Sequence, residues 1–456
     1  MHYGTLPLVA AAAAPISDAE YRVRQATFTD QLPLDTVALI PSNPVATRSA
    51  DVHYPYRTNS DLLYLTGWSA PNSVAVFHHQ QEGGWRCRLF VEARDITQET
   101  WTGRRPGLEG ALEGWPCDES ANIENLADEL TVLLCASTSV HHIPNLSADL
   151  DAIVESELSV QSRERQRSGS GPTASVDPRP LLAEMRLIKS AAEVELMRHA
   201  ARISSAAHEQ TMRMAQPGWG EAAVQGLIEA CFTTNQSEWA YPTIAAGGDN
   251  ATILHYISNR DQIGNGQLIL IDAGAEYLGY AADITRTWPI SGSFSAEQKV
   301  IYELVLKSQL AAIAACRSGN PYTAPHDAAR EVLAKGLMEL GIIGDQELEQ
   351  ALDKEQLGRF YMHNTGHWLG MDVHDVGIYM PEGEARELRP GMVITVEPGL
   401  YFGAWRDDLG NVEPKWLGIG IRIEDDVLIT EGDPDVLTAD CPKSIEELES
   451  IIGCAD

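Results

Sequence analysis

Hydrophobic and polar positions follow one pattern before residue 160 and another after residue 178. From about residue 21 to residue 158, short apolar runs such as VALIPS, SVAVFHH and CRLFVEA alternate with polar or helix-like segments. Short apolar runs separated in this way are typical of the strands of an α/β domain. We therefore predict an N-terminal α/β domain over residues 17–160.

The segment QSRERQRSGSGPTASVDP, residues 161–178, breaks this pattern. It is polar, contains Gly, Ser and Pro, and has no periodic apolar positions. Such a composition is typical of a linker. We predict a linker over residues 161–178 and a second domain over residues 179–452.

The second domain contains helical and strand-like patterns in two similar blocks. Ser190 and Glu193, within the periodic segment LLAEMRLIKSAAEVELMRHAARISSAAHEQTMRM, have the spacing of a capping box at a helix start. Ser295 and Gln298 repeat that spacing before KVIYELVLKSQLAAIAA. Strands are predicted at QLILIDA, LGYAADITRTW, MVITVE and GIGIRIEDDVLIT. The result is a mixed α/β (α+β) domain with a weak internal doubling.

Length and composition restrict the class of protein. A chain of 456 residues is long enough for two or three domains, and 44% hydrophobic with 21% charged residues is ordinary for a soluble globular protein. No apolar run reaches the roughly 18 residues that span a bilayer, so no membrane domain is expected. A formal charge of −32 repels phosphate backbones and anionic lipids, which argues against nucleic acid as a partner.

The cysteines and the N-terminus favour a cytoplasmic protein. Seven scattered cysteines show no paired spacing typical of a zinc site or a disulfide framework. The first twenty residues, MHYGTLPLVAAAAAPISDAE, lack the Lys/Arg-bearing segment of an export signal. We expect them to form an N-terminal arm or a first helical turn.

Four carboxylates in apolar strand contexts need an explanation. Asp272 is the second-to-last residue of QLILIDA, and Glu397 is the last residue of MVITVE. Asp283 lies within LGYAADITRTW, and Glu424 lies within GIGIRIEDDVLIT. An ionised carboxylate buried among apolar side chains is costly unless a positive charge compensates it. Since strand side chains alternate between faces, all four acids could be directed to one concave face.

Two divalent cations would balance four converging carboxylates. His367, in YMHNTGHWLGMDVHDVG, is the candidate fifth ligand. A site dominated by oxygen ligands favours Mn²⁺ or a similar ion over a thiolate-bound metal. For any single acid the alternative is an ordinary salt bridge, and Arg422, two residues before Glu424, is the clearest candidate partner. Five such residues in this order are harder to explain by salt bridges alone.

These motifs resemble the metal-dependent Xaa-Pro peptidases of the pita-bread fold, and most closely aminopeptidase P. The five candidate ligands coincide with that family's five metal-ligand positions, in IDAGAEYLGYAADITRTW, HNTGHWLGMDVHDVG, VEPGLY and GIGIRIEDD. The N-terminal stretches TRSADVHYPYRTNSDLLYLTGW and ARDITQETWTGRR resemble the aminopeptidase P N-terminal domain, so the likeness covers roughly residues 17–452. One departure is Asn364-Thr365-Gly366 before the ligand histidine, where the Gly-His pair is more typical of prolidases.

The resemblance implies an N-terminal creatinase/prolidase-like domain, a C-terminal pita-bread catalytic domain and two divalent ions, Mn²⁺ or alternatively Zn²⁺ or Co²⁺. A hydroxide bridging the ions would hydrolyse the bond between an N-terminal residue and a penultimate proline. Glu397 would also shuttle the proton to the leaving nitrogen. The implied partners are peptides with proline second, and the likeness further suggests a homotetramer or homodimer in contact through the N-terminal domain.

The resemblance also implies roles for residues around the ligands, and each has a structural alternative. His255 and His374 would donate hydrogen bonds to the substrate carbonyl oxygen. His363 would lie beside the proline pocket, and Arg422 would orient Glu424 or bind substrate. Tyr241 would hold a metal-bound aspartate, and Tyr401 and Trp101 would be pocket aromatics. Asp375, Asp425 and Asp426 are expected to be solvated or structural.

Two other functions remain open from sequence. A prolidase would share the metal chemistry but act on dipeptides, with organophosphate hydrolysis as a further side activity of such enzymes. A non-catalytic pita-bread binding module is a different class. Such modules usually lack some ligands, whereas here the set of five is complete.

Overall fold

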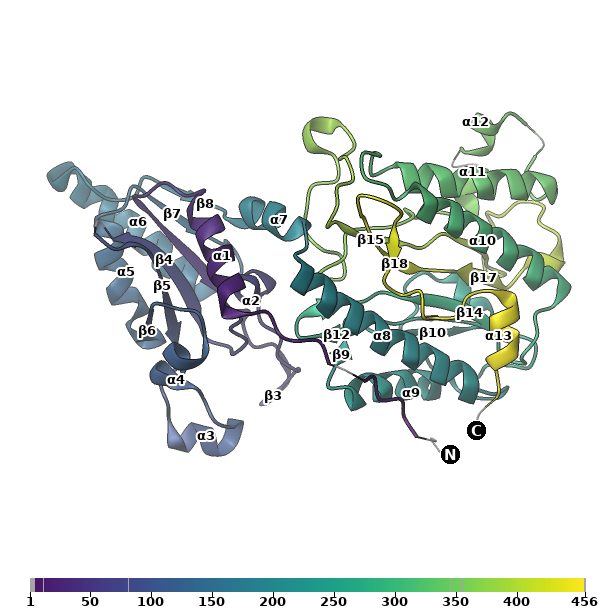
Figure 1. Ribbon diagram of the computed structural model, residues 1–456, viewed down its shortest axis with the longest axis horizontal. Helices are drawn as coiled ribbons and strands as arrows, with labels where there is room; N and C mark the ends of the chain where they lie inside the picture. The colour runs from purple at the N-terminus through teal and green to yellow at the C-terminus, as the bar shows by residue number, and fades with distance from the viewer. Residues whose placement is uncertain (1–4, 11, 81, 345, 354–355, 455–456) are drawn as a thin grey trace. The chain divides into compact units, whose positions relative to one another are not determined.

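The computed structural model describes residues 5–10, 12–80, 82–344, 346–353 and 356–454 (Figure 1). The chain forms two compact units. Ile16–Arg186 make up the N-terminal unit, and Leu187–Asp456 together with Met1–Pro15 make up the C-terminal unit. No helix among the described residues is long and apolar enough to cross a membrane.

The N-terminal unit contains a six-stranded mixed sheet. Its strands, in the order β6-β5-β4-β1-β7-β8, are β6 (Glu119–Asn122), β5 (Gly84–Val91), β4 (Val74–Gln80), β1 (Thr36–Pro41), β7 (Ser139–His142) and β8 (Ala174–Val176). A separate hairpin is formed by β2 (Thr47–Ser49) and β3 (Val52–His53). The β4 strand pairs antiparallel with β1 and β5, while β7 runs parallel to β1.

Helices cover both faces of this sheet. They are α1 (Asp18–Thr29), α2 (Ser60–Thr66), α4 (Gly107–Gly114), α5 (Leu126–Cys135) and α6 (Ala148–Ser168). The short helix α3 (Ile96–Thr102) has no buried residue and does not cover the sheet. On one face Leu130 of α5 and Val154 of α6 share a buried cluster with Val76 of β4. On the other, Phe28 of α1 meets the edge of Phe77, the next residue of β4. The alternation of side chains along the strand thus explains why this apolar run is buried on both sides.

The segment predicted as a linker has regular structure. Residues 161–168 form the end of α6, and β8 within the same segment pairs with β7. The boundary between the units instead falls in α7 (Arg179–Leu187), after Arg186. The sequence pattern was misleading here because Gln161 is the only buried residue of α6 after Val154, so the end of this helix lacks an apolar stripe.

Two helix pairs and short sheets make up the C-terminal unit. The helices are α8 (Ala191–Met214), α9 (Glu221–Thr234), α10 (Ala296–Ala315), α11 (Ala324–Glu339), α12 (Leu348–Ala351) and α13 (Ile445–Ile451). Figure 1 shows α8 with α9 on one side of the strands, and α10 with α11 on the other. Both predicted capping boxes, Ser190 with Glu193 and Ser295 with Gln298, are confirmed.

The strands between these helices repeat one arrangement. In the first half, β10 (Ile244–Gly247), β11 (Leu268–Asp272) and β14 (Thr285–Pro289) form one sheet, and β9 (Glu238–Trp239), β12 (Ala275–Tyr277) and β13 (Tyr280–Ala281) another. In the second half, β15 (Val393–Val396), β18 (Asp425–Leu428) and β19 (Asp435–Val436) form a sheet beside the pair β16 (Gly399–Phe402) and β17 (Ile419–Arg422). Helix pair followed by sheets therefore occurs twice, as the sequence blocks indicated.

Candidate metal centre

The four acids lie where strands of the C-terminal unit end or break. Asp272 is the last residue of β11, while the other three occupy short connections between strands: Asp283 between β13 and β14, Glu397 between β15 and β16, and Glu424 between β17 and β18. The expectation that alternation along continuous strands would direct the acids is therefore met only in part. At these breaks the backbone forms hydrogen bonds outside the strand pairs. The N–H of Glu424, for example, donates to the Thr285 carbonyl at 3.0 Å.

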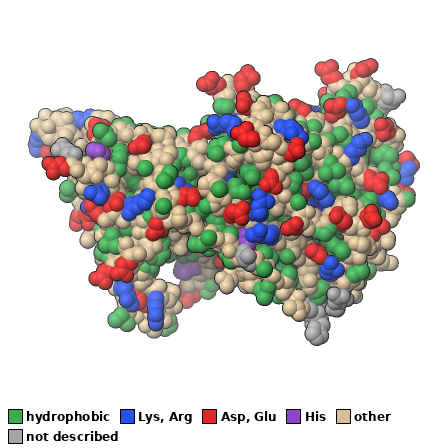
Figure 2. All heavy atoms as spheres, viewed as in Figure 1, with side chains coloured by type: hydrophobic (Ala, Val, Ile, Leu, Met, Phe, Trp, Pro, Cys, Tyr) green, Lys and Arg blue, Asp and Glu red, His purple; other side chains and the backbone are tan. Residues whose placement is uncertain are grey.

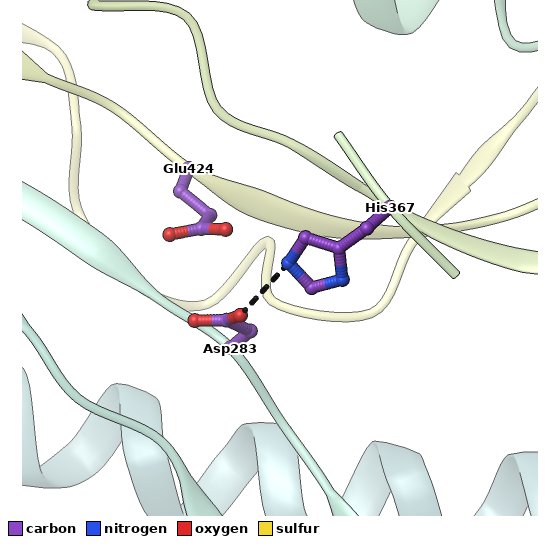
Figure 3. Close-up of side chains that lie close together, drawn as sticks. All are labelled: Asp283, His367 and Glu424. Carbon is purple, nitrogen blue, oxygen red and sulfur yellow. Dashed lines mark ion pairs between the residues drawn. The ribbon is translucent and has the colours of Figure 1, made fainter. Parts of the chain in front are cut away.

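Three of the five expected ligands are already in position to share one ion. Ligand atoms of Asp283, His367 and Glu424 all lie within 4.8 Å of one another. Figure 3 shows the three side chains directed toward a common centre, with the His367 Nε2 atom 3.4 Å from Asp283 Oδ2. The Nδ1 atom of His367 donates to the Trp368 carbonyl at 3.0 Å, which leaves Nε2 as the ligand atom.

The remaining two ligands adjoin this group. Glu397 Oε1 is 3.7 Å from His367 Nε2. The hydroxyl of Tyr241 lies 2.6 Å from Asp272 Oδ1 and 2.5 Å from Asp283 Oδ1, so it links the two aspartates. Tyr241 therefore lies beside two candidate ligand aspartates, in agreement with its predicted position.

Arg422 lies beside the candidate ligand carboxylates, and its direct partner among them is Asp272. Its Nη2 atom donates to Asp272 Oδ2 at 2.6 Å, its Nε to the Thr285 hydroxyl at 3.1 Å, and its Nη1 to the Tyr401 hydroxyl at 3.3 Å. The Thr285 hydroxyl donates in turn to Glu424 at 2.6 Å, so Arg422 reaches Glu424 through Thr285, and its orientation of Glu424 stays a prediction. The direct ion pair of Arg422 is with Asp272 and not with Glu424. The two-residue spacing was misleading because β17 ends between Arg422 and Glu424.

Negative charge is crowded at this centre. Burial, followed by repulsion from the neighbouring acids, raises the pKa of Glu424 well above its usual range. Burial also raises the pKa of Asp283, although its contact with His367 acts in the opposite direction. Burial likewise raises the pKa of Glu397 to about 7. Although burial opposes its charge, Asp283 and Glu397 raise the pKa of His367 to about 9. One guanidinium and one imidazole do not balance four carboxylates.

The residues present fit a divalent metal site. Four carboxylates and one imidazole provide the oxygen-rich ligand set that hard and borderline divalent ions prefer. Such an ion would supply the missing positive charge and would be bound by neutral His367. The hydroxyls of Tyr241 and Thr285 donate hydrogen bonds to ligand carboxylates, and such hydrogen bonds orient metal ligands.

Three further histidines surround the ligands. The ring of His374 meets the edge of the His367 ring with centroids 4.3 Å apart. His363 Nε2 is 2.8 Å from the Tyr401 hydroxyl, and its Nδ1 is 3.8 Å from Glu397 Oε2. Burial, aided by the charge of Arg422, lowers the pKa of His363 to about 3, so this ring is neutral. His255 is close enough for its charge to lower the pKa of both His363 and His374.

One expected site residue belongs to the other unit. Trp101 lies in α3 of the N-terminal unit and is 82% exposed. Within the C-terminal unit, Tyr401 is fully buried beside His363 and Arg422. The two aromatics that the resemblance grouped together therefore have different environments.

Three aspartates expected to be solvated or structural support the site, and sequence reasoning missed one further residue, Thr285. Asp426 accepts from the backbone N–H of Asp283 at 3.1 Å and is buried, as is Asp425, which pairs with Arg286 at 2.7 Å. Asp375 pairs with Lys189 at 3.0 Å, and both side chains are buried. All three aspartates are thus structural and none is solvated. Thr285, whose hydroxyl contacts Glu424, had no sequence signal beyond its strand context.

Comparisons with known proteins agree with this geometry. Residues 195–431 match metallopeptidase family M24, and residues 21–141 match the aminopeptidase P N-terminal domain. The Xaa-Pro aminopeptidase of Escherichia coli K12 is 38% identical over 96% of this chain and 99% of its own. Two solved structures superpose with TM-scores of 0.91 over 96% of this chain: Pseudomonas aeruginosa aminopeptidase PepP, 39% identical over 98% of its chain, and zinc-substituted E. coli aminopeptidase P in complex with product, 38% identical over 99% of its chain.

Fold and acidic site together define a metal-dependent peptidase with a pita-bread catalytic domain, which is the fold predicted from sequence. The named relatives match this chain over both the catalytic and the N-terminal domain, so the comparison identifies a particular group within this class of peptidases. The chain belongs to metallopeptidase family M24, among the Xaa-Pro aminopeptidases (aminopeptidase P). Membership in M24 implies divalent metal ions.

Proposed function

We propose that this protein hydrolyses the bond between an N-terminal residue and a penultimate proline in peptides. The observation that carries the proposal is the convergence of Asp283, His367 and Glu424 in the unit that matches M24. Relatives that match nearly the whole chain are named Xaa-Pro aminopeptidases, which favours this activity over that of a prolidase. A complete ligand set argues against a non-catalytic binding module.

Two divalent ions, in our proposal Mn²⁺, would be held by five residues: Asp272, Asp283, His367, Glu397 and Glu424. Zn²⁺ or Co²⁺ are alternatives, and zinc substitution of the E. coli relative supports a site tolerant of more than one metal. When bound, the ions would activate water for attack and polarise the scissile carbonyl.

Glu397 is the proposed proton carrier. Its carboxylate adjoins His367 on one side and His363 on the other, where it can accept a proton from water and deliver it to the departing proline nitrogen. His374 and His255 are proposed to donate hydrogen bonds to the carbonyl oxygen as negative charge develops. The edge contact of His374 with His367 supports a place within reach of the reacting carbonyl.

Proline recognition is assigned to three residues of the C-terminal unit, His363, Tyr401 and Arg422. An Xaa-Pro bond has no N–H, so a protease that binds extended backbone loses a donor there. A ring-shaped pocket beside the metal centre does not need that donor. The contacts of Tyr401 with both His363 and Arg422 support such a pocket.

The proposed setting is that of a cytoplasmic homotetramer or homodimer. All seven cysteines are free in the structure, which supports a reducing compartment. Neither nucleic acid nor membrane is a proposed partner of a chain with a formal charge of −32.

The test compares an Xaa-Pro dipeptide with an Xaa-Pro-Yaa-Zaa tetrapeptide, using metal-stripped protein with and without Mn²⁺. Metal-dependent release of the first residue from the tetrapeptide is the expected result. Cleavage of the dipeptide alone would identify a prolidase. Two bound metals without cleavage of either peptide would identify a binding module.

A further inference from the structure

A cavity of about 650 Å³ adjoins the candidate metal centre on the side of His363. Its lining includes His326, Arg330, Tyr361, Met362, His363 and Asn364. His363 is the common wall, because its Nδ1 atom is also 3.8 Å from Glu397 Oε2. The proposed chemistry uses neither His326 nor Arg330.

Arg330 brings to this cavity a positive charge that no carboxylate of the described residues pairs with. It lies in α11, is half-buried, and donates through Nη2 to the Leu352 carbonyl. Among the described residues no carboxylate forms an ion pair with it, although the chain has 65 acidic and 33 basic residues. Four of its five N–H donors therefore have no acceptor in the described part of the chain.

His326 adds a neutral donor. His326 Nδ1 lies 2.9 Å from the Thr365 hydroxyl, which can donate or accept, and 3.2 Å from the Thr365 backbone N–H, which can only donate. We therefore assign Nδ1 as the acceptor. Burial, aided by the charge of Arg330, lowers the pKa of His326 and keeps the ring neutral. The hydrogen must then lie on Nε2, for which the described residues provide no acceptor. Thr365, which holds the ring in this state, belongs to the Asn364-Thr365-Gly366 segment that departs from the aminopeptidase P pattern.

We propose that this cavity binds a carboxylate of the substrate on the C-terminal side of the proline, through Arg330 and His326. The inference rests on the proposed function, in which His363 borders the proline ring and the chain beyond proline continues past it. A guanidinium and an N–H donor in one cavity match a carboxylate, and the half-buried position strengthens the interaction. The carboxylate can be the C-terminus of a short peptide or an acidic side chain of a longer one.

Wild-type enzyme loaded with Mn²⁺ tests the proposal with four peptides. They are Ala-Pro-Ala with a free C-terminus, its C-terminal amide, and the amides of Ala-Pro-Asp and Ala-Pro-Asn. We expect kcat/KM to be roughly five- to tenfold higher for free Ala-Pro-Ala than for its amide, mainly through KM. A higher kcat/KM for the Asp peptide than for the Asn peptide identifies a side-chain carboxylate as the bound group. A higher kcat/KM for free Ala-Pro-Ala than for its amide identifies the C-terminal carboxylate.

Two variants assign the preference to Arg330. Arg330→Gln should abolish it, and Arg330→Lys should retain most of it. Arg317→Gln is the matched control, because it removes the same charge from an arginine that pairs with Asp433 in the loop before β19. Equal rates within each peptide pair for wild type, or a preference that survives in Arg330→Gln, would overturn the proposal. Failure of wild type to cleave any peptide would instead overturn the proposed function.

Discussion

At the scale of single residues, Glu397 is the most direct test of the chemistry. Replacing it with Gln keeps the side-chain shape and one oxygen but removes the ability to carry a proton. We expect Glu397→Gln to lower kcat by roughly 10²- to 10⁴-fold while the fold is retained. Steady-state kinetics on an Xaa-Pro tetrapeptide, with thermal unfolding measured in parallel, provide the comparison.

Metal content is the control for this variant. If Glu397→Gln binds as much Mn²⁺ as wild type, lost turnover reports proton transfer and not loss of the ions. Turnover near the wild-type level would contradict the role assigned to Glu397.

His208 gives a prediction about stability. It is fully buried in α8, its Nε2–H donates to the Ala273 carbonyl at 2.9 Å, and burial lowers its pKa to about 4. Between pH 6.5 and pH 4 the unfolded chain binds a proton on this ring and the folded chain does not, so stability falls as pH falls. Between pH 7 and pH 4 the free energy of unfolding should fall in both metal-free proteins. We expect the fall to be roughly 3 kcal/mol smaller for His208→Gln than for wild type. Denaturant unfolding at several pH values measures this, and parallel curves would exclude His208 as the source.

The ligands were predictable as residues, but several of their supports were not. Carboxylates in apolar runs are visible because burying an unpaired charge is costly, and this anomaly identified Asp272 and Glu397 without any structure. The pairing of Arg422 with Asp272 was not visible, since it joins residues 150 positions apart. His326 and Arg330 gave no signal, because a histidine and an arginine on a helix are normally solvated.

At the scale of elements, the connection that carries His255 is held by one buried carboxylate at the start of α9. Glu221 is fully buried and accepts four hydrogen bonds of 2.8–3.0 Å from residues on both sides of His255: Gly247, Asn250, Tyr256 and Asp261. We expect Glu221→Gln to lower kcat about tenfold with little change in KM, because His255 is no longer positioned for the developing charge.

The control for this prediction is Glu229→Gln in the same helix, which removes the same charge from a carboxylate that accepts from Gln225 and Thr243 instead. Loss of hydrogen bonds to a buried charged group costs about 2 kcal/mol, so both variants are studied well below their unfolding temperatures. A kcat for Glu221→Gln within twofold of that for Glu229→Gln would show that this connection does not need Glu221.

Helices with a clear start signal were predicted well, whereas strand ends were not. The capping boxes of α8 and α10 are local, so sequence spacing suffices to identify them. The break between β13 and β14, where Asp283 lies, depends on a contact with Asp426 from the second half of the unit. No local pattern contains that contact, and none distinguishes the solvated end of α6 from a linker.

At the scale of the whole molecule, division into two units was predictable because the apolar pattern changes along the chain. The position of the boundary was not, since residues 161–178 complete the N-terminal sheet. The two units also differ in whether their stability depends on bound metal. The N-terminal sheet has an ordinary apolar core, whereas both halves of the C-terminal unit direct carboxylates at each other.

Metal removal should therefore destabilise one unit selectively. Asp272 and Asp283 come from the first half of the C-terminal unit and Glu397 and Glu424 from the second, so bound ions crosslink the halves and cancel their repulsion. At an ion concentration 100 times Kd this linkage contributes about 2.7 kcal/mol, which corresponds to roughly 5–10 °C in Tm for a unit of this size. We expect chelation to speed hydrogen exchange in β11, β15 and β18 and to leave β1 and β4 unchanged, and Mn²⁺ to reverse the effect. Exchange that quickens equally in both units would mean that metal stabilises the fold through something other than these four acids.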